Sequence, residues 1–165
     1  MTSASTIFNG KLVTVDAMII IKFHALLALD KFIDWAKREI VVEKRIKSEA
    51  KYSKAGQIDL ASYIENNLII EEEIEGKEQE NLFYHYLTNK SLGVIIHEGE
   101  AACLALAISK GYGLACDEKV VRDEFKRKCP GQICTNSWGI VSKARKIGLI
   151  GTKAAEGLLE GLHQV

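Results

Sequence analysis

The sequence predicts an α/β domain, built as a three-layer α/β/α sandwich around a mostly parallel sheet of about five short strands. The first observation is that short apolar runs rich in β-branched residues alternate with longer segments whose apolar residues recur at helical spacing. Strands joined through helices in this way are usually parallel and buried on both faces. The second is size: 165 residues with a single proline suit one domain over residues 1–165.

The N-terminal half predicts two strand–helix units followed by a less regular stretch. A β-type run ends at Asp16, after which apolar residues keep a helical period through Ile33. A second β-branched run then leads into a charged helical segment. In chain order we expect a strand at 11–15, a helix from Asp16 to Ile33, a strand at 39–42, a helix at 43–54, a short helix at 58–65, a strand at 68–70 and a helix at 78–88.

The C-terminal half is more regular. The alanine-rich segment 100–110 contains strong helix formers and ends at Gly111, a suitable C-terminal cap. A buried strand at 113–116 follows and stops at Asp117. Beyond it we expect a helix at 118–128 that Pro130 ends, a strand at 132–134, a helix at 137–146 and a last helix from a Thr152 cap to Leu162.

Composition excludes several classes of protein. The 22 basic and 22 acidic residues cancel, so the chain lacks the cationic excess of proteins that coat nucleic acid non-specifically. Lys22 and His24 interrupt the apolar run at 18–29, which argues against a signal peptide or a membrane span. No CxxC pair is present, so we expect reduced thiols, no structural zinc site and a cytoplasmic location. The cysteines are Cys103, Cys116, Cys129 and Cys134.

Four acidic residues are expected to meet at one edge of the sheet. In alternating strand–helix units the carboxyl ends of the strands and the following helix N-termini share an edge, where open α/β folds bind ligands. Clustered carboxylates repel one another, and Mg²⁺ or Mn²⁺ relieves that repulsion and can assist phosphoryl hydrolysis. The alternative for each acid alone is a helix cap or a solvent-facing position. The four are Asp16 and Asp117, directly after strands, Glu100 in the first turn of its helix, and Glu49 in the second turn after the strand at 39–42.

Four stretches of the chain resemble the PIN domain family, metal-dependent nucleases that include the VapC-type toxins of toxin–antitoxin pairs. Residues 15–20 and 41–49 are similar to its first two strands with their acids, 99–107 to its Gly-Glu-Ala helix start, and 114–119 to the strand before its next acid. The resemblance implies endoribonuclease activity through bound Mg²⁺ or Mn²⁺. It implies Asp16, Glu49, Glu100 and Asp117 as catalytic residues, with Asp16, Glu100 and Asp117 as metal ligands, Glu118 as an additional acid, and Thr135 and Asn136 as further polar site residues.

Two departures from the family pattern keep other functions open. Met18 stands where many members have asparagine, and Glu43 stands where many have proline. Met18 in place of asparagine weakens the hydrogen-bond support of the metal ligands. The alternative function is therefore a catalytically silent module that binds RNA or protein. A nucleotide-binding domain and a serine or cysteine hydrolase have less support. The sequence contains neither phosphate-binding glycine motif and no nucleophile elbow.

A basic face and an apolar segment suggest partners. Lys119, Arg122 and Lys126 share one face of the helix after Asp117 and are expected to bind RNA phosphates, with an ordinary solvated helix face as the alternative. Asn136 is a further residue expected to bind RNA. Trp138 is a candidate for stacking on a base, with a core position as the alternative. The segment from Met18 to Ile33 has more apolar positions than one buried face needs, which predicts a homodimer. The resemblance to toxins adds an antitoxin protein as a further partner to test.

Overall fold

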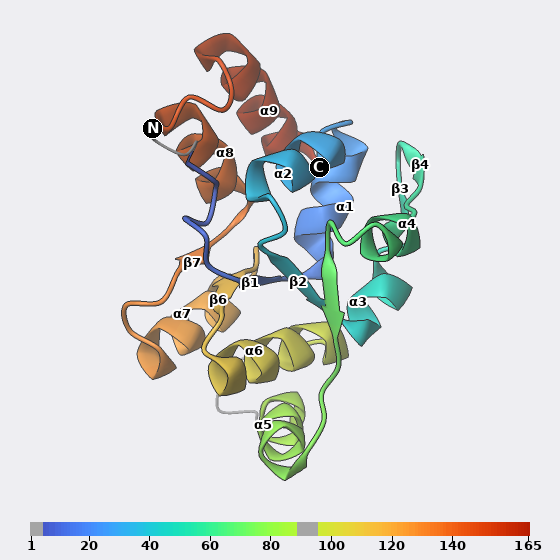
Figure 1. The fold of residues 1–165 in the computed structure, drawn as a ribbon, viewed down its shortest axis with the longest axis vertical. Coiled ribbons are helices and arrows are strands. Elements are labelled where there is room, and N and C mark those ends of the chain that lie inside the picture. The colour runs from blue at the N-terminus through green and yellow to red at the C-terminus, as the bar shows by residue number, and fades with distance from the viewer. Residues whose placement is uncertain (1–4, 89–95) are drawn as a thin grey trace.

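The computed structural model describes residues 5–88 and 96–165. Its centre is a parallel five-stranded sheet in the order β5-β2-β1-β6-β7, with helices on both faces (Figure 1), so the predicted α/β/α sandwich is confirmed. The strands are β1 (Val13–Val15), β2 (Ile40–Glu43), β5 (Ile70–Glu72), β6 (Gly113–Ala115) and β7 (Cys134–Thr135), and a separate antiparallel hairpin joins β3 (Tyr52–Ser53) to β4 (Gly56–Gln57).

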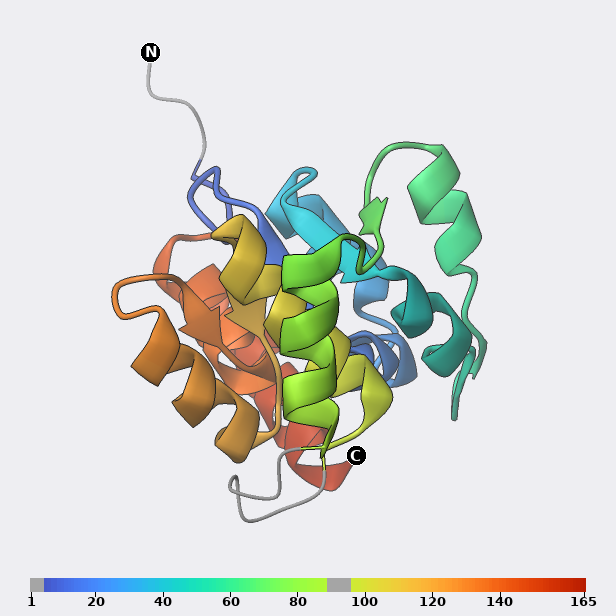
Figure 2. The same ribbon diagram turned by 90° about the horizontal axis from the view of Figure 1, so that it is seen from below.

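The helices form two layers around this sheet. On one face α6 (Glu98–Lys110) contacts β1, β2 and β6, and α7 (Lys119–Lys128) contacts β6 and β7. α5 (Lys77–Thr88) packs across the outer side of α6 (Figure 2). The other face carries α1 (Ala17–Ala25), α2 (Leu29–Ala36), α8 (Ser137–Lys146) and α9 (Thr152–Gln164) (Figure 1). The short helices α3 (Lys44–Glu49) and α4 (Leu60–Glu65) belong to the connection from β2 to β5.

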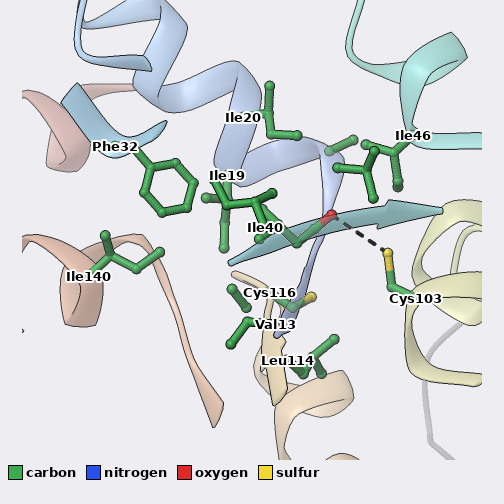
Figure 3. Close-up of a cluster of buried hydrophobic side chains, with 14 of the residues drawn as sticks. Val13, Ile19, Ile20, Phe32, Ile40, Ile46, Cys103, Leu114, Cys116 and Ile140 are labelled. Atoms are coloured by element: carbon green, nitrogen blue, oxygen red, sulfur yellow. Dashed lines mark hydrogen bonds between the residues drawn. The ribbon is translucent and has the colours of Figure 1, made fainter. Parts of the chain in front are cut away.

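The core lies where α1 and α6 cover the sheet. β1, β2 and β6 are buried along their whole length, as expected for parallel strands covered on both faces. In Figure 3, Ile19 and Ile20 of α1 gather above Val13, Ile40 and Leu114 of the strands. Each such side chain stabilises the fold by roughly 1.5–3 kcal/mol when it is buried. The strands that end at the carboxyl edge of the sheet are therefore held rigidly by the packed core.

The helix expected from Asp16 to Ile33 is in fact two helices. Leu27 has a left-handed backbone, with φ 57°, and the chain turns there before α2 begins. The turn brings Phe23 of α1 and Phe32 of α2 into a stack with ring centroids 4.9 Å apart. Two short helices can each bury an apolar face in one core, whereas one straight helix would carry its second half away from the sheet.

That turn also explains most of the apolar excess in this segment. Ile19, Ile20, Phe23 and Phe32 are all buried within one chain. Leu27 and Met18 stay exposed, at 82% and 46% of their surface, and the homodimer remains a prediction that rests on these few positions. No helix within residues 5–88 and 96–165 combines the length and apolar content needed to span a bilayer.

Several further boundaries differ from expectation. The last strand, expected at 132–134, is found at Cys134–Thr135. The charged helix expected at 43–54 ends at Glu49, because the chain then forms the β3–β4 hairpin. The strand expected at 68–70 is shifted to Ile70–Glu72, so part of the acidic run lies in an edge strand, where Lys47 pairs with Glu71 at 3.1 Å. Thr152 is the first residue of α9 rather than its cap.

Candidate metal centre

Asp16 and Glu100 meet at the carboxyl edge of the sheet. Asp16 follows β1, has an extended backbone and makes no side-chain capping hydrogen bond to α1. Its side chain is buried, with only 3% of the residue exposed. Glu100 lies in the first turn of α6, where its Oε1 accepts the N–H of His97 at 2.9 Å. One oxygen from each carboxylate and the Sγ of Cys116 lie within 4.8 Å of one another.

The surroundings of Asp16 disfavour its charge. Burial, together with the nearby carboxylates of Glu100, Glu49 and Asp117, raises the pKa of Asp16 to about 7 against the opposing effect of the Ala17 N–H. The thiol of Cys103 lies 3.9 Å from Oδ1 of Asp16, and the thiol of Cys116 lies 3.9 Å from Oδ2 of the same carboxylate. Thiols are weak donors and leave the carboxylate poorly compensated. A divalent cation between Asp16 and Glu100 would remove this strain.

A cavity of about 540 Å³ opens beside this pair. It has room for an ion with several waters, since a water occupies about 30 Å³ in the liquid. Met18 and Ile21 form an apolar wall from α1, and most of the polar lining is acidic. The polar lining consists of Asp16, Glu49, His97, Glu98, Glu100 and Glu118. The structure thus places Glu49 and Glu118 at the same cavity as the acid pair.

Glu49 reaches this cavity because Gly99 leaves space for it. Glu49 is the last residue of α3, and a Cβ on Gly99 would overlap its carboxylate oxygens. Burial raises the pKa of Glu49, while a hydrogen bond from the backbone N–H of Gly99 opposes the rise. The glycine before Glu100 is therefore needed for close packing of two acidic segments rather than for an unusual backbone angle.

Glu43, at the end of β2, is a second fully buried carboxylate but has a cation beside it. It caps α3 by accepting the N–H of Arg45, and the Arg45 guanidinium pairs with it at 2.5 Å. Burial raises the pKa of Glu43, and Arg45 acts in the opposite direction. The guanidinium also donates to Glu98 at 2.7 Å, which ties α3 to the start of α6. Glu43 thus caps α3, and Arg45, which pairs with it, holds α3 against the start of α6.

Asp117 lies next to the acid pair but has partners of its own. Its Oδ1 accepts the Ser137 N–H at 2.8 Å, and its Oδ2 accepts the Ser137 hydroxyl at 3.0 Å and the Lys22 ammonium at 2.7 Å. Among the described ligand atoms that lie within 4.8 Å of one another, Cys116 stands in the position where we expected Asp117. The structure therefore brings Asp16 and Glu100 together and holds Asp117 beside them.

The residues expected to bind RNA have mixed surroundings. Arg122 donates to the carbonyl of Cys116 at 2.8 Å, and Asn136 caps α8 by accepting the Gly139 N–H at 2.8 Å, so both stabilise the backbone around the site. Lys119 is exposed and pairs with Asp123 at 2.7 Å, and Lys126 is exposed in the last turn of α7. Their contact with RNA stays a prediction.

Sequence reasoning missed Lys22 and Ser137. The signal for Lys22 was present, because a charged residue inside an apolar helical run must find a counter-charge if the run is buried. Nothing along the chain identifies Asp117 as that counter-charge, since 95 residues separate the two. Trp138, next to Ser137, is 43% exposed and contacts His163 edge-on, so the structure does not place it in the core.

Comparison with known proteins adds one finding. A family model described as a PIN domain matches residues 12–165, from the start of β1 through α9. Comparisons with curated proteins and with solved structures give no match. The matched residues include every strand of the central sheet and all the acids at its carboxyl edge. The chain belongs to the PIN domain family, whose fold is of the nuclease type.

Proposed function

We propose that this chain is an endoribonuclease that cleaves RNA phosphodiester bonds with the help of Mg²⁺ or Mn²⁺. The observation that supports it most strongly is the buried Asp16 carboxylate, which faces Glu100 with acids and weak thiol donors around it. Carboxylate oxygens are the ligands that hard divalent cations prefer. Burial raises the pKa of the Cys116 thiol, so its sulfur stays protonated and the oxygens of Asp16 and Glu100 would hold the ion.

The chemistry follows from the groups around the cavity. When bound, the ion supplies an acidified water and neutralises charge on the phosphoryl group. Glu49 faces the same cavity, and because burial raises its pKa it is suited to accept a proton there. Met18 offers no hydrogen bond at the position where many members carry asparagine. Support of Asp16 would therefore come from its backbone and from the thiols of Cys103 and Cys116.

Narrower parts of this proposal concern partners and location. The proposed substrate is RNA, bound with help from Lys119, Arg122, Lys126 and Asn136, and the proposed location is the cytoplasm. A homodimer is supported by the exposed Leu27 and Met18. If the chain is the toxin of a toxin–antitoxin pair, a small protein should bind it and suppress cleavage. The competing function is a silent module that binds RNA or protein, which the exposed Met18 at the cavity supports.

Purified protein incubated with end-labelled single-stranded RNA tests the proposal. We expect endonucleolytic products with Mg²⁺ or Mn²⁺, none with EDTA, and a loss of about 10³-fold in rate for Asp16→Asn. Asp34→Asn is the matched control, because Asp34 is an exposed partner of Lys37 on α2. Cleavage that survives EDTA and Asp16→Asn would identify a contaminating nuclease. RNA binding without cleavage by the wild type would favour the silent module.

A further inference from the structure

Lys22 places a positive charge against Asp117, the acid that lies beside the Asp16–Glu100 pair. It lies on α1 four residues after Met18, so the two share one face of the helix, and Met18 lines the cavity. The Lys22 side chain keeps 21% of its surface exposed, and its Nζ lies 2.7 Å from Oδ2 of Asp117. The ammonium group is thus held against Asp117, one of the acids close enough to Asp16 to raise its pKa, and it stays accessible to solvent.

The position of this ammonium group is set by α8. Ser137 is buried, and its N–H and hydroxyl both donate to Asp117, which in turn accepts from Lys22. A lysine ammonium has three donors, and the contact with Asp117 uses one of them. The remaining donors can bind an anion that approaches from the exposed side.

The ion pair is hard to explain as a device for stability alone. A half-buried pair gains little over apolar side chains of similar size, because both charges lose hydration. Most neighbours of Lys22 on α1 are apolar and buried, among them Ile19, Ile20 and Phe23. An apolar residue would therefore suit position 22 at least as well for folding. A cation is useful there if the site must bind a polyanion, because the acidic lining of the cavity repels one.

We propose that Lys22 binds a phosphate group of the RNA next to the Asp16–Glu100 pair, and that Asp117 and Ser137 are positioning residues that hold its ammonium group. The identity of the polyanion rests on the function proposed above. The contact is to the backbone, so it contributes affinity without sequence preference.

Salt dependence of RNA binding tests this role without any cleavage. A fluorescently labelled single-stranded RNA is titrated in EDTA with wild type, Lys22→Met and Lys22→Arg over a series of salt concentrations. We expect Lys22→Met to bind about 5–10-fold more weakly for unrelated RNA sequences and to reduce the slope of log K against log salt by about 0.7. Lys22→Arg keeps the charge and should keep the slope.

Lys110→Met is the matched control. Lys110 is also a partly exposed lysine with a carboxylate partner, Glu72 at 3.9 Å, but it lies at the opposite end of α6 from the site. Its removal should change RNA affinity by less than about twofold. A second readout is Mn²⁺ affinity without RNA, which should stay the same or rise in Lys22→Met because a nearby positive charge has been removed.

Two outcomes separate this inference from the proposed function. An unchanged salt slope in folded Lys22→Met, while the wild type still binds and cleaves RNA, would overturn the role of Lys22 alone. A wild type that neither binds nor cleaves RNA would overturn the proposed function. If Lys22→Met does not fold, Lys22→Gln removes the charge but keeps a polar side chain. An unchanged slope of log K against log salt in Lys22→Gln would then overturn the role of Lys22.

Discussion

Asp16 and Asp117 follow neighbouring strands of one parallel sheet, yet their surroundings are opposite. β1 and β6 pair with Val15 opposite Ala115, so the two aspartates leave the sheet at almost the same level. Asp16 is buried next to acids and thiols, and its pKa rises to about 7. Asp117 accepts three hydrogen bonds, one of them from the Lys22 ammonium. A shared local pattern, an apolar strand followed by aspartate, has produced one strained carboxylate and one satisfied carboxylate.

Glu43 at the end of β2 shows whether burial alone leaves a carboxylate uncompensated. It is as deeply buried as Asp16, but Arg45 pairs with it. Burial alone therefore does not make a metal site, because a nearby arginine can compensate a buried carboxylate within the protein. Of the three strand-end acids Asp16, Glu43 and Asp117, Asp16 is the one whose described neighbours include no cation. A bound metal ion would therefore stabilise the Asp16 carboxylate more than the other two.

The largest expected effect is on stability without metal. The folded-state pKa of Asp16, about 7, lies above its ordinary value of 3.8, so the folded chain binds more protons than the unfolded chain between these values. The wild type should then lose stability as the pH rises through this window. Asp16→Asn removes the buried charge and should raise the free energy of unfolding by up to about 4 kcal/mol above pH 7. Urea unfolding in EDTA at several pH values measures this.

Asp117→Asn is the natural contrast in the same experiment. It weakens the contacts with Lys22 and Ser137 and should lower the free energy of unfolding by about 1–2 kcal/mol. A destabilised Asp16→Asn at pH 8 would show that the Asp16 carboxylate is not strained, and the contrast between the two aspartates would fail.

A smaller difference is expected in metal binding. Asp16→Asn should lower the affinity for Mn²⁺ by at least about 100-fold, whereas Asp117→Asn should lower it by about tenfold, because Asp117 acts on the site from beside it. Isothermal titration calorimetry of the two variants and the wild type gives both values. Equal losses would mean that Asp117 moves away from Lys22 to bind the ion directly.

The smallest effect concerns the packing of Glu49. Gly99→Ala places a methyl group where the Glu49 carboxylate lies, so Glu49 must move and RNA cleavage should fall by about tenfold. Stability should fall by about 1 kcal/mol. Gly157→Ala in α9 is the control, since a Cβ there meets nothing within 4 Å, and it should stabilise the chain by about 0.5–1 kcal/mol. Unchanged cleavage in Gly99→Ala would remove Glu49 from the site.

Much of the fold was predictable because it depends on local patterns. Apolar runs of β-branched residues marked the central strands, and Gly111, with φ 72°, ended α6 as its C-cap. The break at Leu27 was not predictable, because nothing in the local apolar pattern marks it and the contact that it allows, Phe23 on Phe32, exists only in the folded chain. The β3–β4 hairpin was missed for a related reason: the charged residues around it have no strong preference of their own.

For the site, local sequence determined which acids lie at the carboxyl edge, because a strand that ends at an aspartate delivers it there in any parallel α/β sheet. Tertiary structure decided how each of them is compensated. Lys22 reaches Asp117 and Arg45 reaches Glu43, whereas Asp16 meets Glu100 and two thiols. Charge interactions depend on distance and burial rather than on separation along the chain, so only the folded chain distinguishes these three acids.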